Sequence, residues 1–147
     1  MSRIIRSVIL VCTLFFGNLT TVHAEEELTA EKIGEIALEV FQKYGVEAPY
    51  PTIYMAEADH WSVEGTVIGR AALFKDGTEI IFLQDDVVGQ DKDVLIDLLD
   101  HEISHVQNWR LNGLEVSNAH PHGRAYKQIC REHAARKASC NAYMRFN

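Results

Sequence analysis

Basic residues, cysteines and long apolar runs are all scarce in this sequence. The chain of 147 residues has 14 Lys and Arg against 21 Asp and Glu, which gives a formal net charge of −7 at pH 7. Nucleic acids and anionic membrane surfaces attract proteins through basic patches. The excess of acidic residues gives no indication of binding to either partner. Internal repeats, low-complexity segments and interdomain linkers are also absent from the sequence. These absences predict one acidic domain that does not bind nucleic acid.

Residues 1–24 have the pattern of an export signal. Arg3 and Arg6 precede a short apolar core over residues 7–16, and the residues up to Ala24 are acceptable before a cleavage site. Because the apolar run is too short to cross a bilayer as a stable helix, we expect no membrane anchor. We therefore predict a signal peptide over residues 1–24 and a secreted or periplasmic protein.

Residues 25–147 are enough for a single domain with a modest core, and they contain two of the three cysteines. In an exported protein an even pair indicates a disulfide, so we predict a bond between Cys130 and Cys140. In the chain-entropy view, closing this short loop stabilises the fold by about 2 to 3 kcal/mol. A zinc-binding cysteine pair is the weaker alternative, because the spacing is not C-x-x-C and no second pair exists.

The stretch VLIDLLDHEISHVQNW, residues 94–109, contains an H-E-x-x-H match formed by His101, Glu102 and His105. Side chains four positions apart share one face of an α-helix, so His101 and His105 can direct two imidazoles at one metal ion. Glu102 is offset by about 100° around the helix axis, where its carboxylate can act as general base on a water at the metal. The alternative is that the pattern arose by chance on two hydrogen-bonded core histidines.

The flanking residues predict a helix independently of the motif. Asp91 suits the N-cap, Asp93 suits the positive end of the helix dipole, and Gly113 suits a stop. Most of the helix surface is apolar, and the one polar stripe consists of Asp93, Asp97, Asp100, Ser104 and Gln107. A helix this apolar belongs inside a domain, where histidines are costly unless they are hydrogen-bonded or bound to a metal.

The other segments predict an α+β fold in which a small, mostly antiparallel sheet packs on this central helix. We expect a helix that Thr29 caps and that runs to about Tyr44, where Gly45 ends it. The other expected elements are strands over residues 52–55, 66–74 (interrupted at Gly69) and 78–83, a hairpin turn at Asp76-Gly77, a polar loop after Gly113, and a helix from Arg124 to about Lys137. We expect His60 to be a surface loop residue. Because the strand over residues 78–83 lies just before the motif helix, we hypothesise that it holds an extended substrate by strand addition.

Catalytic zinc usually has three protein ligands and an open position for water, so the two helix histidines need a third partner. The metzincin spacing would place a histidine at position 111, but that residue is Leu111, which excludes this family. The downstream candidates are Glu115, His120, His122, Glu132 and His133. We expect His120 to be a solvated loop residue and His133 to pack or face solvent, whereas Glu132 remains open as a ligand.

The sequence His122-Gly123-Arg124-Ala125-Tyr126, downstream of H-E-x-x-H, resembles the second motif of the SprT-like (Spartan-type) zinc metallopeptidases. The resemblance covers roughly residues 51–134. It implies a zincin-like fold, Zn2+ as the cofactor and His122 as the third metal ligand. Familiar members are intracellular and often act near DNA, and some have an additional zinc ribbon held by cysteines. This chain has a predicted export signal, an excess of acidic residues and no such ribbon.

The motif and the resemblance together predict that residues 25–147 are an exported zinc metallopeptidase domain that hydrolyses a protein or peptide substrate. His101, His105 and His122 would be the metal ligands and Glu102 the catalytic base. The alternative is a non-catalytic, zinc-stabilised binding module, because a zinc site can serve folding alone. The intact Glu102 argues against this alternative, since a purely structural site needs no base beside the metal.

Overall fold

The computed structural model describes residues 28–56, 68–84 and 91–141. The predicted signal peptide and His60 lie outside these ranges. The elements, in chain order, are α1 Ala30–Lys43, β1 Thr52–Ala56, β2 Gly69–Leu73, β3 Glu79–Gln84, α2 Lys92–Asn112, α3 Leu114–Ala119, α4 Arg124–His133 and the 3-10 helix η3 Lys137–Cys140. The described part of the chain is therefore an α+β fold with four α-helices and one three-stranded sheet.

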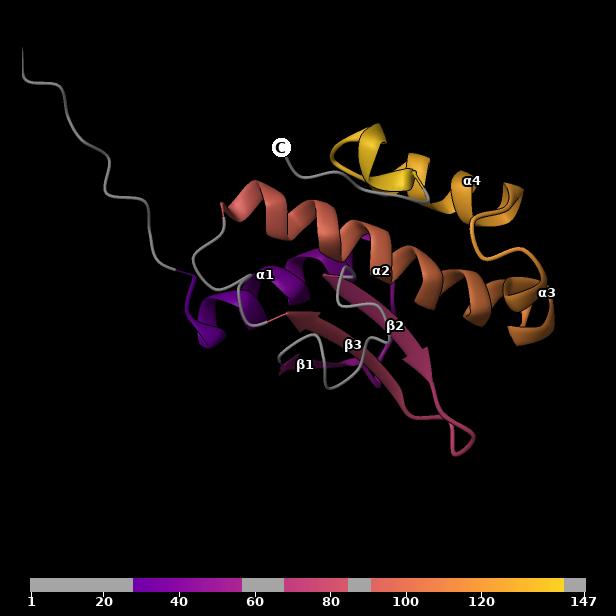
Figure 1. Ribbon diagram of the computed structural model, residues 1–147, viewed down its shortest axis with the longest axis horizontal. Helices are drawn as coiled ribbons and strands as arrows, with labels where there is room; N and C mark the ends of the chain where they lie inside the picture. The colour runs from indigo at the N-terminus through magenta and orange to yellow at the C-terminus, as the bar shows by residue number, and fades with distance from the viewer. Residues whose placement is uncertain (1–27, 57–67, 85–90, 142–147) are drawn as a thin grey trace, which may run out of the picture.

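Helix α2 runs through the middle of the molecule, with the sheet on one side and α4 and η3 on the other (Figure 1). The Asp91 side chain caps its first turn by accepting a hydrogen bond of 2.8 Å from the Asp93 amide. Gly113, with φ of 83°, ends the helix because the left-handed region of φ is open to glycine. The predicted central helix and both of its ends are confirmed.

Helix α1 supplies the other half of the main core. Thr29 accepts a hydrogen bond of 3.2 Å from the Lys32 amide at its start, as predicted, and the helix ends at Lys43, one residue before the predicted Tyr44. Its apolar face packs against α2 and the central strand β3, in one cluster that includes Ile33, Ile36, Val40, Phe41, Ile81, Leu83, Leu95, Leu99 and Ile103. This core fixes α2 against the sheet.

The sheet is mixed, which corrects the prediction of a mostly antiparallel sheet. Strand β3 is central: β2 joins it through the predicted hairpin as an antiparallel partner, and β1 pairs with it in parallel. Turn residues in the sequence indicate the hairpin, but a parallel partner is brought in from a distant part of the chain and leaves no local signal. Because both sides of β3 are paired, the hypothesis that residues 78–83 take up a substrate by strand addition is wrong.

Arg110, in the last turn of α2, ties the helix to the sheet. Its guanidinium binds both carboxylate oxygens of Glu79 at the start of β3 and donates to the carbonyl oxygens of Glu47 and Pro49, each at 2.7 Å. Burial alone would raise the pKa of Glu79, but hydrogen bonds from Arg110 and Trp109 lower it. This charged anchor fixes the sheet, and with it the edge strand β2, relative to α2.

The middle of the polar stripe of α2, formed by Asp97, Asp100 and Ser104, is buried instead of facing water. Asp97 and Asp100 are 5% and 0% exposed. Asp100 accepts hydrogen bonds from Lys43 Nζ at 2.5 Å and from the Ala135 amide at 2.8 Å. Buried carboxylates are tolerated when they are paired in this way. The stripe therefore holds the chain after α4 against α2.

The carboxyl-terminal region differs from the prediction in two places. Residues 114–119, predicted to be a loop, form the short helix α3, which has too few residues to show a clear period in sequence. Helix α4 ends at His133, before the predicted Lys137. The chain is extended at Ala134 and then turns back alongside α4. The turn brings Cys140 to Cys130, and the predicted disulfide between them is confirmed. Within the described ranges, no helix is long and apolar enough to span a membrane.

Candidate metal centre

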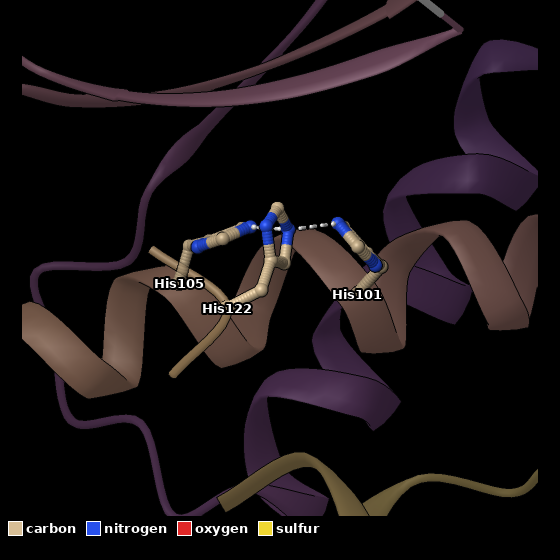
Figure 2. A group of neighbouring side chains, drawn as sticks. All are labelled: His101, His105 and His122. Atoms are coloured by element: carbon tan, nitrogen blue, oxygen red, sulfur yellow. Dashed lines mark hydrogen bonds between the residues drawn. The ribbon is translucent and has the colours of Figure 1, made fainter. Parts of the chain in front are cut away.

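Three histidines meet at one point beside α2. His101 and His105 lie on consecutive turns of α2, and His122 lies between α3 and α4. Figure 2 shows the rings turned toward one another, with His122 Nε2 at 3.2 Å from His101 Nε2 and 3.1 Å from His105 Nε2. One ring nitrogen from each residue lies within 4.8 Å of the other two, so the group could hold a metal ion.

The other candidate ligands are not part of this group among the described residues. Glu115, His120 and Glu132 are exposed, and the ring of His133 packs against that of Tyr44 at a centroid distance of 4.9 Å. The expectations for His120 and His133 are therefore confirmed.

Gly123 permits the tight turn that places His122 next to His101 and His105. Its amide donates a hydrogen bond of 2.9 Å to the carbonyl oxygen of His120. A Cβ atom at position 123 would lie 2.8 Å from the Cβ of His120, closer than side-chain atoms approach. This close contact explains why glycine follows His122 in the motif. The sequence alone does not reveal the contact.

His101 is oriented by hydrogen bonds to its second ring nitrogen. Nδ1 lies 2.8 Å from the carbonyl oxygen of Ser139 and 2.9 Å from the hydroxyl of Tyr126. Because a carbonyl oxygen can only accept, Nδ1 carries the proton, and Nε2 keeps its lone pair for a metal. Sequence reasoning missed Ser139, since it acts through its main chain from 38 residues away.

Burial keeps the imidazoles neutral, which is the form that binds metals. It lowers the pKa of His101 to about 4, against the opposing effect of the hydrogen bond to Ser139. It lowers the pKa of His105 to about 3, and the neighbouring His101 and His122 add to the effect. Burial and the charge of Lys127 also lower the pKa of His122. At neutral pH the three imidazoles would therefore not have to lose a proton before a metal could bind.

The metal-free protein should therefore lose stability as the pH falls from about 7 toward 4. Unfolded imidazoles take up protons near pH 6.5, whereas folded His101 and His105 do so only near 4 and 3. The unfolded chain binds more protons across this range, so the free energy of unfolding falls until those folded pKa values are passed. Glu102 has the opposite effect on stability, since its folded pKa of about 7 exceeds its unfolded value. It therefore cancels the stability loss caused by about one imidazole.

Urea unfolding of chelator-treated protein at pH 7 and pH 5 measures this effect. The loss of stability should be smaller in His105→Gln, whose amide does not titrate. Equal losses in the variant and the wild type would show that other groups cause the acid sensitivity.

Glu102 lies beside the histidines and is 4% exposed. Its Oε2 accepts a hydrogen bond of 2.7 Å from the Ala71 amide of β2. Burial raises its pKa to about 7, although the Ala71 amide and the charge of Arg70 act against the shift. A carboxyl with a pKa near neutrality can both accept and release a proton at pH 7.

A cleft of about 380 Å³ gives access to this group of side chains. Helix α2 lines it with His101, Glu102, His105 and Trp109. The edge strand β2 and the region from α3 to His122 line the rest, through Gly69, Arg70, Ala71, Ser117, Asn118, Pro121 and His122. The candidate metal centre is therefore open on a side bounded by an edge strand.

Gly69 controls how closely β2 approaches α2. A Cβ atom there would lie 2.6 Å from Leu98 Cδ1 and 3.0 Å from Glu102 Oε1. Because Leu98 is buried, Gly69→Ala should push the strand outward and lower stability by about 1 to 3 kcal/mol, as overpacking does. Urea unfolding measures the change.

Gly34→Ala is the matched control, because apart from its chain neighbours and the adjacent backbone of α1 no atom lies within 4 Å of its Cβ position. It should raise stability by about 0.5 to 1 kcal/mol through helix propensity. If Gly69→Ala were as stable as the wild type, the close contact between β2 and α2 would not exist in solution.

Comparisons with family models, with curated proteins and with solved structures find no match for this chain. The geometry of the site and the two sequence motifs are therefore the observations that bear on its function.

Proposed function

We propose that residues 25–147 form an exported zinc metallopeptidase of the SprT-like (Spartan-type) kind, with a zincin-like arrangement of motif helix and sheet. The observation that carries the proposal is the convergence of His101, His105 and His122 beside a buried Glu102 in an open cleft. Export remains a prediction from the first 24 residues, and the disulfide fits an oxidising compartment.

The donor set favours zinc. Three imidazole nitrogens with a further position open to the cleft match the ligand set of catalytic zinc sites, whereas magnesium and calcium prefer oxygen ligands. Zinc, when bound, lowers the pKa of water toward neutrality and polarises a carbonyl group. His101, His105 and His122 would hold it.

Glu102 is the residue that moves the proton in this proposal. The Ala71 amide holds Oε2 at 2.7 Å and so fixes the orientation of the carboxyl group. Oε1 can then accept a proton from the attacking water and pass it to the leaving amine of the cleaved peptide. A pKa of about 7 suits both transfers, because neither state of the carboxyl is strongly favoured at neutral pH.

An extended peptide is the substrate class that the cleft fits best. Strand β2 is an edge strand and lines the cleft. Main-chain groups on such an edge can pair with an extended peptide, which positions its backbone without selecting one side chain. With the central strand β3 excluded, β2 takes the substrate-binding role in this proposal.

The competing function, a zinc-stabilised binding module, fits the site less well. Structural zinc sites are usually closed by four protein ligands. Within the described residues the metal-binding group has three members and lies in an open cleft.

Metal analysis and a peptide-hydrolysis assay on the purified mature chain distinguish the two functions. We expect one zinc per chain and hydrolysis that a chelator abolishes. Bound zinc without hydrolysis of any peptide in a broad library would favour the binding module.

A further inference from the structure

We propose that Asp97 and the Cys130–Cys140 disulfide are positioning elements for the metal centre, which hold the Ser139 carbonyl group where it orients His101. The inference rests on the metal-binding part of the proposed function and does not require peptidase activity. If the inference is correct, metal affinity depends on residues 134–140, although this segment contributes no metal ligand.

His101 Nδ1 has two hydrogen-bond partners of different chemistry. The hydroxyl of Tyr126 lies 2.9 Å from it and can act as donor or acceptor, whereas the carbonyl of Ser139, at 2.8 Å, can only accept. The carbonyl therefore selects the tautomer that leaves Nε2 unprotonated. Without it, the Tyr126 hydroxyl could donate to Nδ1, and the proton would then lie on the nitrogen that faces His105 and His122.

Ser139 is held in place by Asp97 of α2. It belongs to η3, a 3-10 turn of four residues, which is too short to be stable by itself. Its hydroxyl donates a hydrogen bond of 2.8 Å to Asp97 Oδ1, and the Arg136 guanidinium pairs with Asp97 Oδ2. Asp97 thus binds both ends of this turn to α2 from a position one turn before His101.

The disulfide links the Ser139 turn to the helix that carries Tyr126. Cys140 directly follows Ser139, and its bond to Cys130 joins the turn to α4. The same helix carries Tyr126, and Tyr126, Cys130 and Cys140 form a small buried cluster apart from the main core. Figure 1 shows α4 and η3 together on the side of α2 that faces away from the sheet. Both hydrogen-bond partners of His101 Nδ1 therefore belong to one cross-linked unit.

The test compares zinc dissociation constants, measured by competition with a chromophoric chelator on the mature chain. Asp97→Ala and the double variant Cys130→Ser with Cys140→Ser should each bind zinc about 10 to 100 times more weakly, the loss typical when a residue that orients a metal ligand is removed. Asp97→Asn keeps an oxygen that accepts from Ser139, so it should recover much of the affinity. The visible absorption of the cobalt-substituted protein should change in the same order.

Val40→Ala is the matched control, since it truncates a buried α1 residue of the main core cluster, whereas Cys140 belongs to the separate cluster with Tyr126 and Cys130. It should lower thermal stability while zinc affinity stays unchanged. If the double cysteine variant does not fold, the zinc affinity of Asp97→Ala, which keeps the disulfide, is compared with that of the wild type. Wild-type affinity in the folded Asp97→Ala variant, or an equal loss in Val40→Ala, would overturn the inference. A wild-type chain without zinc would instead refute the proposed function on which it rests.

Discussion

Replacing Glu102 by glutamine should lower the rate of peptide hydrolysis by about 10²-fold or more while zinc stays bound. The amide is almost the same size as the carboxyl group, so it can still accept the hydrogen bond from Ala71 at 2.7 Å. It cannot take up a proton at neutral pH, and so the proposed base is lost. The measurement is kcat/KM on a peptide substrate, together with the zinc content of the same sample.

The control for this variant is Glu35→Gln, which removes an exposed carboxylate of α1 remote in sequence from the motif helix. It should leave both zinc content and kcat/KM unchanged. Full activity in Glu102→Gln would mean that another group is the base. Loss of zinc from Glu102→Gln would mean that the carboxyl group supports the metal and does not act in proton transfer alone.

Replacing His122 by alanine should weaken zinc binding by more than about 10²-fold. The change removes one of the three ring nitrogens that lie within 4.8 Å of one another. Loss of a direct ligand should exceed the 10- to 100-fold effects seen for residues that only orient a ligand. Chelator competition on the folded variant gives the dissociation constant.

His120→Ala is the matched control, because it removes an exposed histidine two positions earlier in the same turn. It should retain zinc as the wild type does. If zinc instead left His120→Ala and stayed on His122→Ala, the third ligand would be His120 or a residue such as Glu132. The resemblance to SprT-like peptidases would then lose its main support.

The features that the sequence predicts correctly are those with a local physical signature. The ends of α2 follow from Asp91 and Gly113, and the β2–β3 hairpin follows from the turn at Gly77. The convergence of His101 and His105 follows from helix periodicity. His122 was found only through a motif that resembles a known family, since nothing in its local pattern gives its distance from α2.

The features that the sequence does not predict depend on contacts between distant residues. The parallel pairing of β1 with β3 is one example. The burial of Asp97 and Asp100 is another, since a polar stripe on a helix gives no sign of whether water or another segment covers it. Ser139 acts on His101 through a main-chain carbonyl, a group that every residue has. Such contacts are specified by the fold as a whole.

The central claim is that His101, His105 and His122 together hold one zinc ion. A crystal structure of the zinc-loaded mature chain, with anomalous data collected on both sides of the zinc absorption edge, tests it most directly. We predict a single anomalous peak about 2.0 to 2.1 Å from the Nε2 atoms of all three histidines, with a non-protein ligand in the fourth position. A peak elsewhere, or one that omits any of the three histidines, would contradict the claim.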